Sequence, residues 1–162
     1  MASSAPTFRK ISWFSLVPQI LLMAGLILGW DYFYPSSGFL YGACSYLIIS
    51  IVLRNSIAKH HRSGIQKVRA GDFANAITDF EKSYAFFSKN AWVDTYRYLT
   101  LLSSSRMSYK EMALNNIAFS YSQIGEGAKA KEYYQQTLQE NPNNALAISA
   151  LKMLSSTSKE EG

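Results

Sequence analysis

Few residues in this chain have the types and spacing that chemistry requires. The two histidines, His60 and His61, are adjacent, and adjacent side chains on a helix point about 100° apart, so they do not readily share one metal ion. The single cysteine, Cys44, lies in an apolar stretch, where a lone thiol usually serves packing. The sequence has no phosphate loop, metal-spaced cysteine set or nucleophile elbow. It therefore predicts no enzyme, no metal site and no cofactor.

Two apolar stretches near the start of the chain, residues 11–30 and 38–53, carry no charge. A helix needs about 20 apolar residues to cross a bilayer, and flanking residues can extend the second stretch. We predict transmembrane helices at 11–30 and 38–56, joined by an external loop at 31–37. The alternative is a cleaved signal peptide followed by a buried core helix. The first stretch is not followed by a small-residue cleavage motif, which favours the transmembrane hairpin.

Charge is unevenly distributed along the chain. Residues 1–70 contain seven Lys and Arg and one acid, whereas residues 71–162 contain nine Lys and Arg and ten acids. The soluble part is not basic, which argues against nucleic-acid binding. Basic residues flank both apolar stretches, so the positive-inside rule places both termini in the cytoplasm of a multi-pass protein of a bacterial inner membrane or its equivalent. Three of them are expected near lipid headgroups: Arg54, Lys59 and Arg62.

Small residues suggest how the two apolar helices pack. Gly25 and Gly29 close the first helix, and Gly38 and Gly42 open the second. Glycines four residues apart allow close approach of helices, and in a hairpin these pairs lie at the same depth. We predict that they pack on each other; alternatively, one pair contacts a partner subunit. Gln19 is costly in lipid without a partner, which makes it a candidate contact to the second helix or another protein, unless it stays hydrated near a helix end.

A 34-residue segment, residues 111–144, has the pattern of a helix pair. Ser108 and Glu111 form a capping box before it, and Pro142 would stop its second helix. Several further residues occupy the apolar, small and turn positions of such a pair: Leu114, Ile117, Ala118, Tyr121, Gly125, Ala130, Tyr134 and Leu138.

A weaker copy lies upstream, at 57–90. Gly64, Gly71, Ala76 and Phe80 stand where the later copy has Ala118, Gly125, Ala130 and Tyr134, always at the same offset along the chain. His60 and Lys67 are polar residues within this copy, which makes it the weaker of the two. The extra residues between the copies, 91–110, are predicted to form an inserted helix with Trp92, Tyr96, Leu99 and Leu102 on one face. A strand is the alternative.

Two further elements complete the prediction. Residues 145–156 are predicted to form a terminal capping helix with Asn144 as its N-cap, followed by a polar tail at 157–162. Because no proline or glycine separates the second apolar helix from the upstream copy until Gly64, we predict one long helix from about residue 39 to 69. It would hold the repeats above the membrane as a stiff stalk.

The segment 111–144 resembles a tetratricopeptide repeat in its length and in the residues quoted above. The resemblance implies an all-α fold, in which a short α-solenoid with an inserted helix follows the transmembrane hairpin. It also implies a protein-binding groove lined by the first helix of each pair. The candidate groove residues are Met112, Asn115, Asn116, Phe119, Ser122, Gln123, His61, Ile65, Val68 and Arg69. One subtype clamps the C-terminal carboxylate of chaperones, but only Asn116 matches that clamp, so a chaperone-tail receptor is not expected.

Two functions fit this organisation. The first is a membrane-anchored adaptor or assembly factor that recruits a protein partner. The second is a permanent accessory subunit of a larger membrane complex, for example a photosynthetic or respiratory one. In both cases the expected partners are the lipid bilayer and other subunits of a membrane complex, and nucleic acid is not expected.

Overall fold

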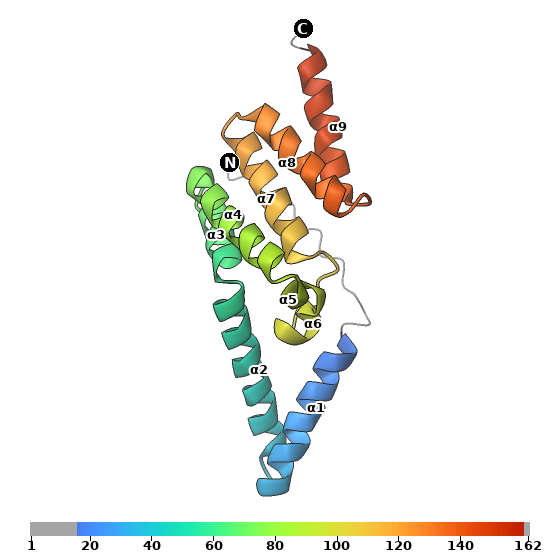
Figure 1. The fold of residues 1–162 in the computed structure, drawn as a ribbon. Coiled ribbons are helices and arrows are strands. Elements are labelled where there is room, and N and C mark those ends of the chain that lie inside the picture. The colour runs from blue at the N-terminus through green and yellow to red at the C-terminus, as the bar shows by residue number, and fades with distance from the viewer. Residues whose placement is uncertain (1–15, 161–162) are drawn as a thin grey trace. The chain divides into compact units, whose positions relative to one another are not determined.

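The computed structural model describes residues 16–160, and every regular element within them is a helix (Figure 1). This confirms the predicted all-α class. Predictions for residues 1–15, including the N-terminal segment 1–10 and the start of the first span, lie outside the described residues. The helices are α1 (Leu16–Phe33), α2 (Gly38–Ile57), α3 (Lys59–Arg69), α4 (Phe73–Lys89), α5 (Ala91–Thr95), α6 (Arg97–Thr100), α7 (Tyr109–Gln123), α8 (Gly127–Glu140) and α9 (Ala145–Glu160).

Contacts divide the described chain into two units. The anchor unit contains residues 16–59 and 91–106, and the helix-pair unit contains residues 60–90 and 107–160. The segment predicted as an insertion into the repeats therefore groups mainly with the apolar helices.

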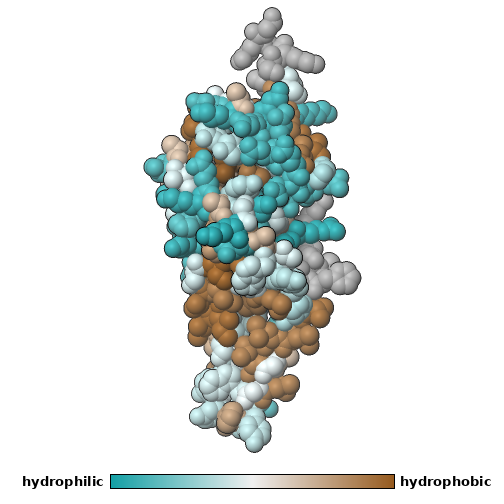
Figure 2. All heavy atoms as spheres, in the orientation of Figure 1, coloured by the Kyte–Doolittle hydropathy of each residue, from teal (hydrophilic) through white to brown (hydrophobic). Residues whose placement is uncertain are grey.

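The anchor unit contains two helices that are long and apolar enough to cross a membrane, α1 with 18 residues and α2 with 20. Most of their large apolar side chains are exposed; Leu28 is 70% and Phe39 is 72% accessible. Figure 2 shows these apolar side chains gathered over α1 and α2. An exposed apolar surface of this kind is what a lipid-facing hairpin requires.

The glycines of this hairpin do not pack as predicted. Gly38 and Gly42 face α1; a Cβ atom at Gly42 would lie only 2.5 Å from the Ile27 Cα, and one at Gly38 would clash with the Asp31 backbone. Gly25 and Gly29 have no described atom within 4 Å of a Cβ at either position. The predicted packing of one glycine pair on the other is therefore wrong, because Gly25 and Gly29 lie on the outer face of α1.

Aromatic side chains join the two helices near their connecting loop. The indole Nε1 of Trp30 donates a hydrogen bond to the Ser45 Oγ at 3.0 Å. The Trp30 ring also lies 6.0 Å from the ring of Tyr34 and 5.4 Å from that of Tyr41. These contacts fix the helices at the loop end of the hairpin.

The predicted uninterrupted helix from about 39 to 69 is wrong. α2 ends at Ile57 and α3 begins at Lys59, with Ala58 between them at φ −96° and ψ 26°. These angles lie in the sparsely populated bridge region outside the helical well. Neither proline nor glycine marks the break, which is why the sequence pattern did not reveal it.

The segment 91–110 does not form the single inserted helix that was predicted. It contains two short helices, α5 and α6, and residues 101–108 are not helical. Leu102 has a positive φ of 46°, which is uncommon for a residue with a side chain. The chain therefore makes a tight, strained turn after α6.

In the helix-pair unit, the same turn joins α3 to α4 and α7 to α8. Gly71 has φ 79° and Gly125 has φ 82°, the left-handed conformation that glycine adopts without strain. The amides after each helix donate in the same pattern, Gly71 to Val68 O and Asp72 to Lys67 O in one turn, Gly125 to Ser122 O and Glu126 to Tyr121 O in the other. Both turns are thus Schellman motifs, one in each copy of the helix pair.

Small residues let the paired helices approach closely. A Cβ atom on Gly64 would lie 2.7 Å from the ring of Phe80, which is fully buried. In the second pair, Ala118 corresponds to Gly64 and Ala130 corresponds to Ala76, and both are fully buried. Between the pairs, Phe80 and Ile117 belong to one core cluster.

The polar Lys67 is explained by a contact across the first pair. Its Nζ lies 2.7 Å from the Asp79 Oδ2, which also accepts a hydrogen bond from the Ser63 hydroxyl at 2.5 Å. Burial raises the pKa of Asp79, but the hydrogen bonds from Lys67 and Ser63 outweigh it and lower the pKa overall. An ion pair with hydrogen bonds thus links α3 to α4 at this position.

The second pair begins and ends as its sequence indicates. The capping box of Ser108 and Glu111 is present at the start of α7. α8 ends at Glu140, two residues before Pro142, and Asn144 caps α9 by accepting a hydrogen bond from the Ala147 amide at 3.0 Å. α9 continues to Glu160, so residues 157–160 of the predicted polar tail are helical, and residues 161–162 lie outside the described residues.

Candidate partner-binding surface

Most of the predicted groove residues contribute to the core or are partly covered. Met112, Asn116 and Ser122 are half-buried. Ile65 and Phe119 pack against the core that contains Phe80, and Val68 belongs to it. Of the whole predicted set, only Arg69 and Gln123 are exposed.

His61 is a core residue, so its assignment to the groove is wrong. It is 4% exposed, and its ring lies 5.5 Å from that of Phe80 and 5.1 Å from that of Tyr109. The Ser83 Oγ lies 3.4 Å from its Nδ1. Burial lowers the pKa of His61 to about 4, so the ring is neutral near pH 7 and acts as an aromatic side chain.

Asn115 is also buried, at 7% exposure, and cannot line an open groove. Its amide Nδ2 donates to the Glu111 carbonyl at 3.0 Å. Its Oδ1 has no hydrogen-bond partner among the described residues. Asn115 is therefore a polar residue whose side chain is buried in the helix-pair unit.

The three residues predicted to contact lipid headgroups differ in their exposure. Lys59 and Arg62 are exposed, as such contacts require. Arg54 is half-buried, and its guanidinium donates to the Leu101 carbonyl at 3.2 Å and the Leu102 carbonyl at 2.5 Å. The guanidinium is thus engaged with backbone carbonyls within the anchor unit, and its predicted contact with lipid headgroups stays a prediction.

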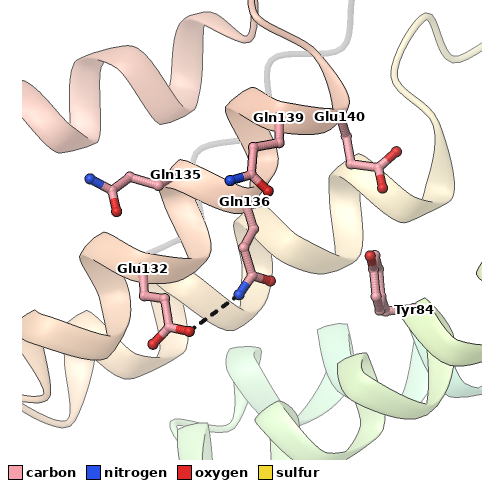
Figure 3. A pocket seen from close by; sticks show the side chains of 6 residues that line it. All are labelled: Tyr84, Glu132, Gln135, Gln136, Gln139 and Glu140. Atoms are coloured by element: carbon pink, nitrogen blue, oxygen red, sulfur yellow. Dashed lines mark hydrogen bonds between the residues drawn. The ribbon is translucent and has the colours of Figure 1, made fainter.

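An open polar hollow of about 390 Å³ lies on the other side of the helix pairs, along their second helices. Figure 3 shows its lining side chains, Tyr84 from α4 and, from α8, Glu132, Gln135, Gln136, Gln139 and Glu140. Gln136 donates to Glu132 at 3.4 Å. Lys110 pairs with Glu140 at 2.7 Å and lies 5.8 Å from the centre of the Tyr84 ring.

The chemistry of this hollow suits protein recognition. Carboxamides offer both donors and acceptors, which can pair with a peptide backbone, and the carboxylates favour basic side chains. This surface lies along the second helices of the pairs, whereas the predicted groove residues lie on the first helices. A signal was present, since polar residues recur along one face of α8 at helical spacing.

Across residues 16–160, the structure brings no three histidine, cysteine or acidic side chains together in a way that could hold a metal ion. Comparisons of the chain with protein-family models, with curated proteins and with solved structures found no match.

Proposed function

We propose that this protein is a membrane-anchored adaptor or assembly factor, which holds a protein partner at the membrane through repeats of the tetratricopeptide type. The observation that carries the proposal is the recurrence of one helix-pair turn, at Gly71 and again at Gly125, in a chain with two exposed apolar helices. Repeated helix pairs of this type present extended surfaces to other proteins. The exposed helices supply the anchor, with both termini in the cytoplasm by the charge rule.

The polar hollow along α8 is the contact surface that we assign to the partner. It is open, and its amides and carboxylates are available from a regular helix, whereas much of the predicted groove is buried. The segment 91–106 groups with the anchor unit, so it does not serve as part of the repeats. Both points favour a protein that binds a partner reversibly.

A second candidate is a permanent accessory subunit of a membrane complex. It is favoured by a groove of about 260 Å³ on α1, lined by Gly25, Leu26, Gly29, Trp30 and Phe33. An open pair of glycines on a lipid-facing helix allows close approach of another transmembrane helix.

Affinity purification in mild detergent with native mass determination separates these functions. Variable, substoichiometric protein partners are expected for an adaptor, and a fixed one-to-one complex would support the accessory subunit. Gln135→Arg/Gln139→Arg, which adds cations to the hollow, should release an adaptor's partner. The matched control Arg69→Ala/Gln123→Ala, on the predicted groove, should retain it. Partner retention by the first variant would contradict the assignment of the hollow.

A further inference from the structure

The segment 91–106 has an unusual distribution of polar and apolar groups. Three of its large side chains are exposed, Trp92 at 63%, Tyr96 at 50% and Leu99 at 50%. Trp92 lies in α5, Leu99 lies in α6, and Tyr96 lies between the two short helices. A folded segment in water normally turns such side chains inward.

The backbone carbonyls of the same segment are bound by side chains from within the unit. Arg97 donates to the carbonyls of Asp94 at 2.9 Å, Ser105 at 3.0 Å and Arg106 at 2.8 Å. The Thr100 hydroxyl donates to the Val93 carbonyl at 2.7 Å. Arg54 from α2 binds the carbonyls of Leu101 and Leu102. These carbonyls are therefore hydrogen-bonded within the protein rather than to water.

This arrangement matches what a lipid environment demands. Non-helical backbone at membrane depth is tolerated only where its polar groups are satisfied within the protein. Tryptophan and tyrosine are enriched at the membrane–water interface, where their rings meet both apolar and polar surroundings. The two requirements are met together in the single short segment 91–106.

The segment is also continuous with the apolar helices. α6 contacts α1, and Arg54 near the end of α2 holds the turn at Leu101 and Leu102 (Figure 1). These contacts place it at the open end of the hairpin, away from the loop at residues 34–37. That end is where the bilayer surface lies if α1 and α2 span the membrane.

We propose that residues 91–106 form an interfacial membrane element, which inserts Trp92, Tyr96 and Leu99 into the headgroup region of the bilayer and is fastened to the hairpin by Arg54. The inference rests on the proposed membrane anchoring of α1 and α2. It adds a second, in-plane contact with lipid to the two spanning helices.

Depth-dependent fluorescence quenching tests the proposal in the full-length protein. The chain has three tryptophans, Trp13, Trp30 and Trp92. Trp13→Phe/Trp30→Phe leaves Trp92 as the sole reporter, and Trp13→Phe/Trp92→Phe leaves Trp30. A third protein, with all three tryptophans replaced by phenylalanine and Ile124→Trp added, reports on an exposed turn of the helix-pair unit. Each is reconstituted into phosphatidylcholine vesicles with and without brominated acyl chains.

We expect brominated lipid to quench Trp92 to an extent comparable with Trp30 and well above Trp at position 124. Aqueous iodide should quench Trp at position 124 more strongly than Trp92 or Trp30. If Trp30 is quenched by lipid while Trp92 is quenched by iodide, the face is open to water and the inference fails. If Trp92 is shielded from both quenchers, a protein covers it and the inference also fails. If lipid quenches neither Trp30 nor Trp92, the membrane anchoring itself is wrong.

Arg54→Lys tests the fastening, because lysine keeps the charge but lacks the planar fork that reaches two carbonyls. In the Trp92 reporter protein, this change should lower lipid quenching and increase tryptic cleavage after Arg97 and Arg106. The control Lys59→Arg, at an exposed position, should change neither. If lipid quenching and tryptic cleavage are unchanged in Arg54→Lys, Arg54 does not hold the segment 91–106 against the hairpin.

Discussion

The anchor unit and the helix-pair unit distribute their side chains in opposite ways. In the helix-pair unit, Phe80 and Ile117 are at most 1% exposed. In the anchor unit, Leu28 and Phe39 are at least 70% exposed, whereas the polar Gln19 and Ser50 are less than a tenth exposed. The difference is the one expected of a chain that meets two solvents, and it supports our proposal of water around the helix pairs and lipid around the hairpin. Each experiment below tests one side of this contrast.

The largest effect is expected from removing the central aromatic side chain of the water-facing unit. Phe80→Ala should lower the free energy of unfolding by about 3–5 kcal/mol, because it leaves a cavity in a close-packed core. Thermal or urea unfolding followed by circular dichroism measures it. Phe86→Ala, at a 36% exposed position of the same helix, is the control. Equal losses in the two variants would contradict the burial pattern.

A pH effect should follow from the buried His61. Its pKa is about 4 in the folded protein and 6.5 when unfolded, so between these values the unfolded chain binds the extra proton. Stability is therefore complete above pH 6.5, falls as the pH drops, and loses about 3 kcal/mol by pH 4.

Urea unfolding between pH 4 and 7 checks this expectation. His61→Phe should flatten the pH dependence, whereas His60→Gln, at the half-buried neighbouring position, should leave it unchanged. A His61→Phe protein that keeps the full acid sensitivity would show that other groups cause it.

A smaller effect is expected from filling the hairpin interface. Gly42→Leu should destabilise the α1–α2 contact by about 1–3 kcal/mol, since a side chain there meets the backbone of Ile27. Gly25→Leu, on the open face of α1, is the matched control. Cysteine cross-linking between α1 and α2 in vesicles measures the contact. If Gly25→Leu disrupts the α1–α2 contact and Gly42→Leu does not, Gly25 and not Gly42 lies in the interface between the two helices.

The smallest losses of stability are expected from substitutions at the glycine turns, and they should be equal in the two helix pairs. Gly71→Ala and Gly125→Ala each force a side chain into the left-handed conformation, at a cost of about 1–2 kcal/mol. Because neither position has a described atom within 4 Å of the new Cβ, strain is the main cause. Thermal unfolding of the two variants should give similar losses. A clear difference would show that the turns are not equivalent.

The sequence was sufficient to predict features that depend on local signals. The capping box at Ser108, the Asn144 cap and the all-helical class depend on short-range chemistry, and the structure contains each of them. The two long apolar helices also follow from composition alone.

Features that depend on contacts between distant residues were not predictable in this way. The burial of His61 depends on Phe80 and Tyr109, and the outward position of Gly25 and Gly29 depends on the rotation of α1. The segment 91–106 groups with the anchor unit, and Arg54 binds it there. In the sequence, Arg54 is only one of several basic residues that indicate membrane topology. Helical periodicity predicts which residues share a face of a helix, but it does not predict which other element packs against that face.

The hydrogen bonds of Arg54 also affect the order in which the chain can fold. They join groups that are separated by 47 and 48 positions in the chain, and the whole α3–α4 pair lies in the loop that they close. Closing a long loop costs more entropy than forming neighbouring contacts. During synthesis, α1–α2 and then α3–α4 can form from local contacts, whereas the anchor unit is completed only after residue 102 has left the ribosome.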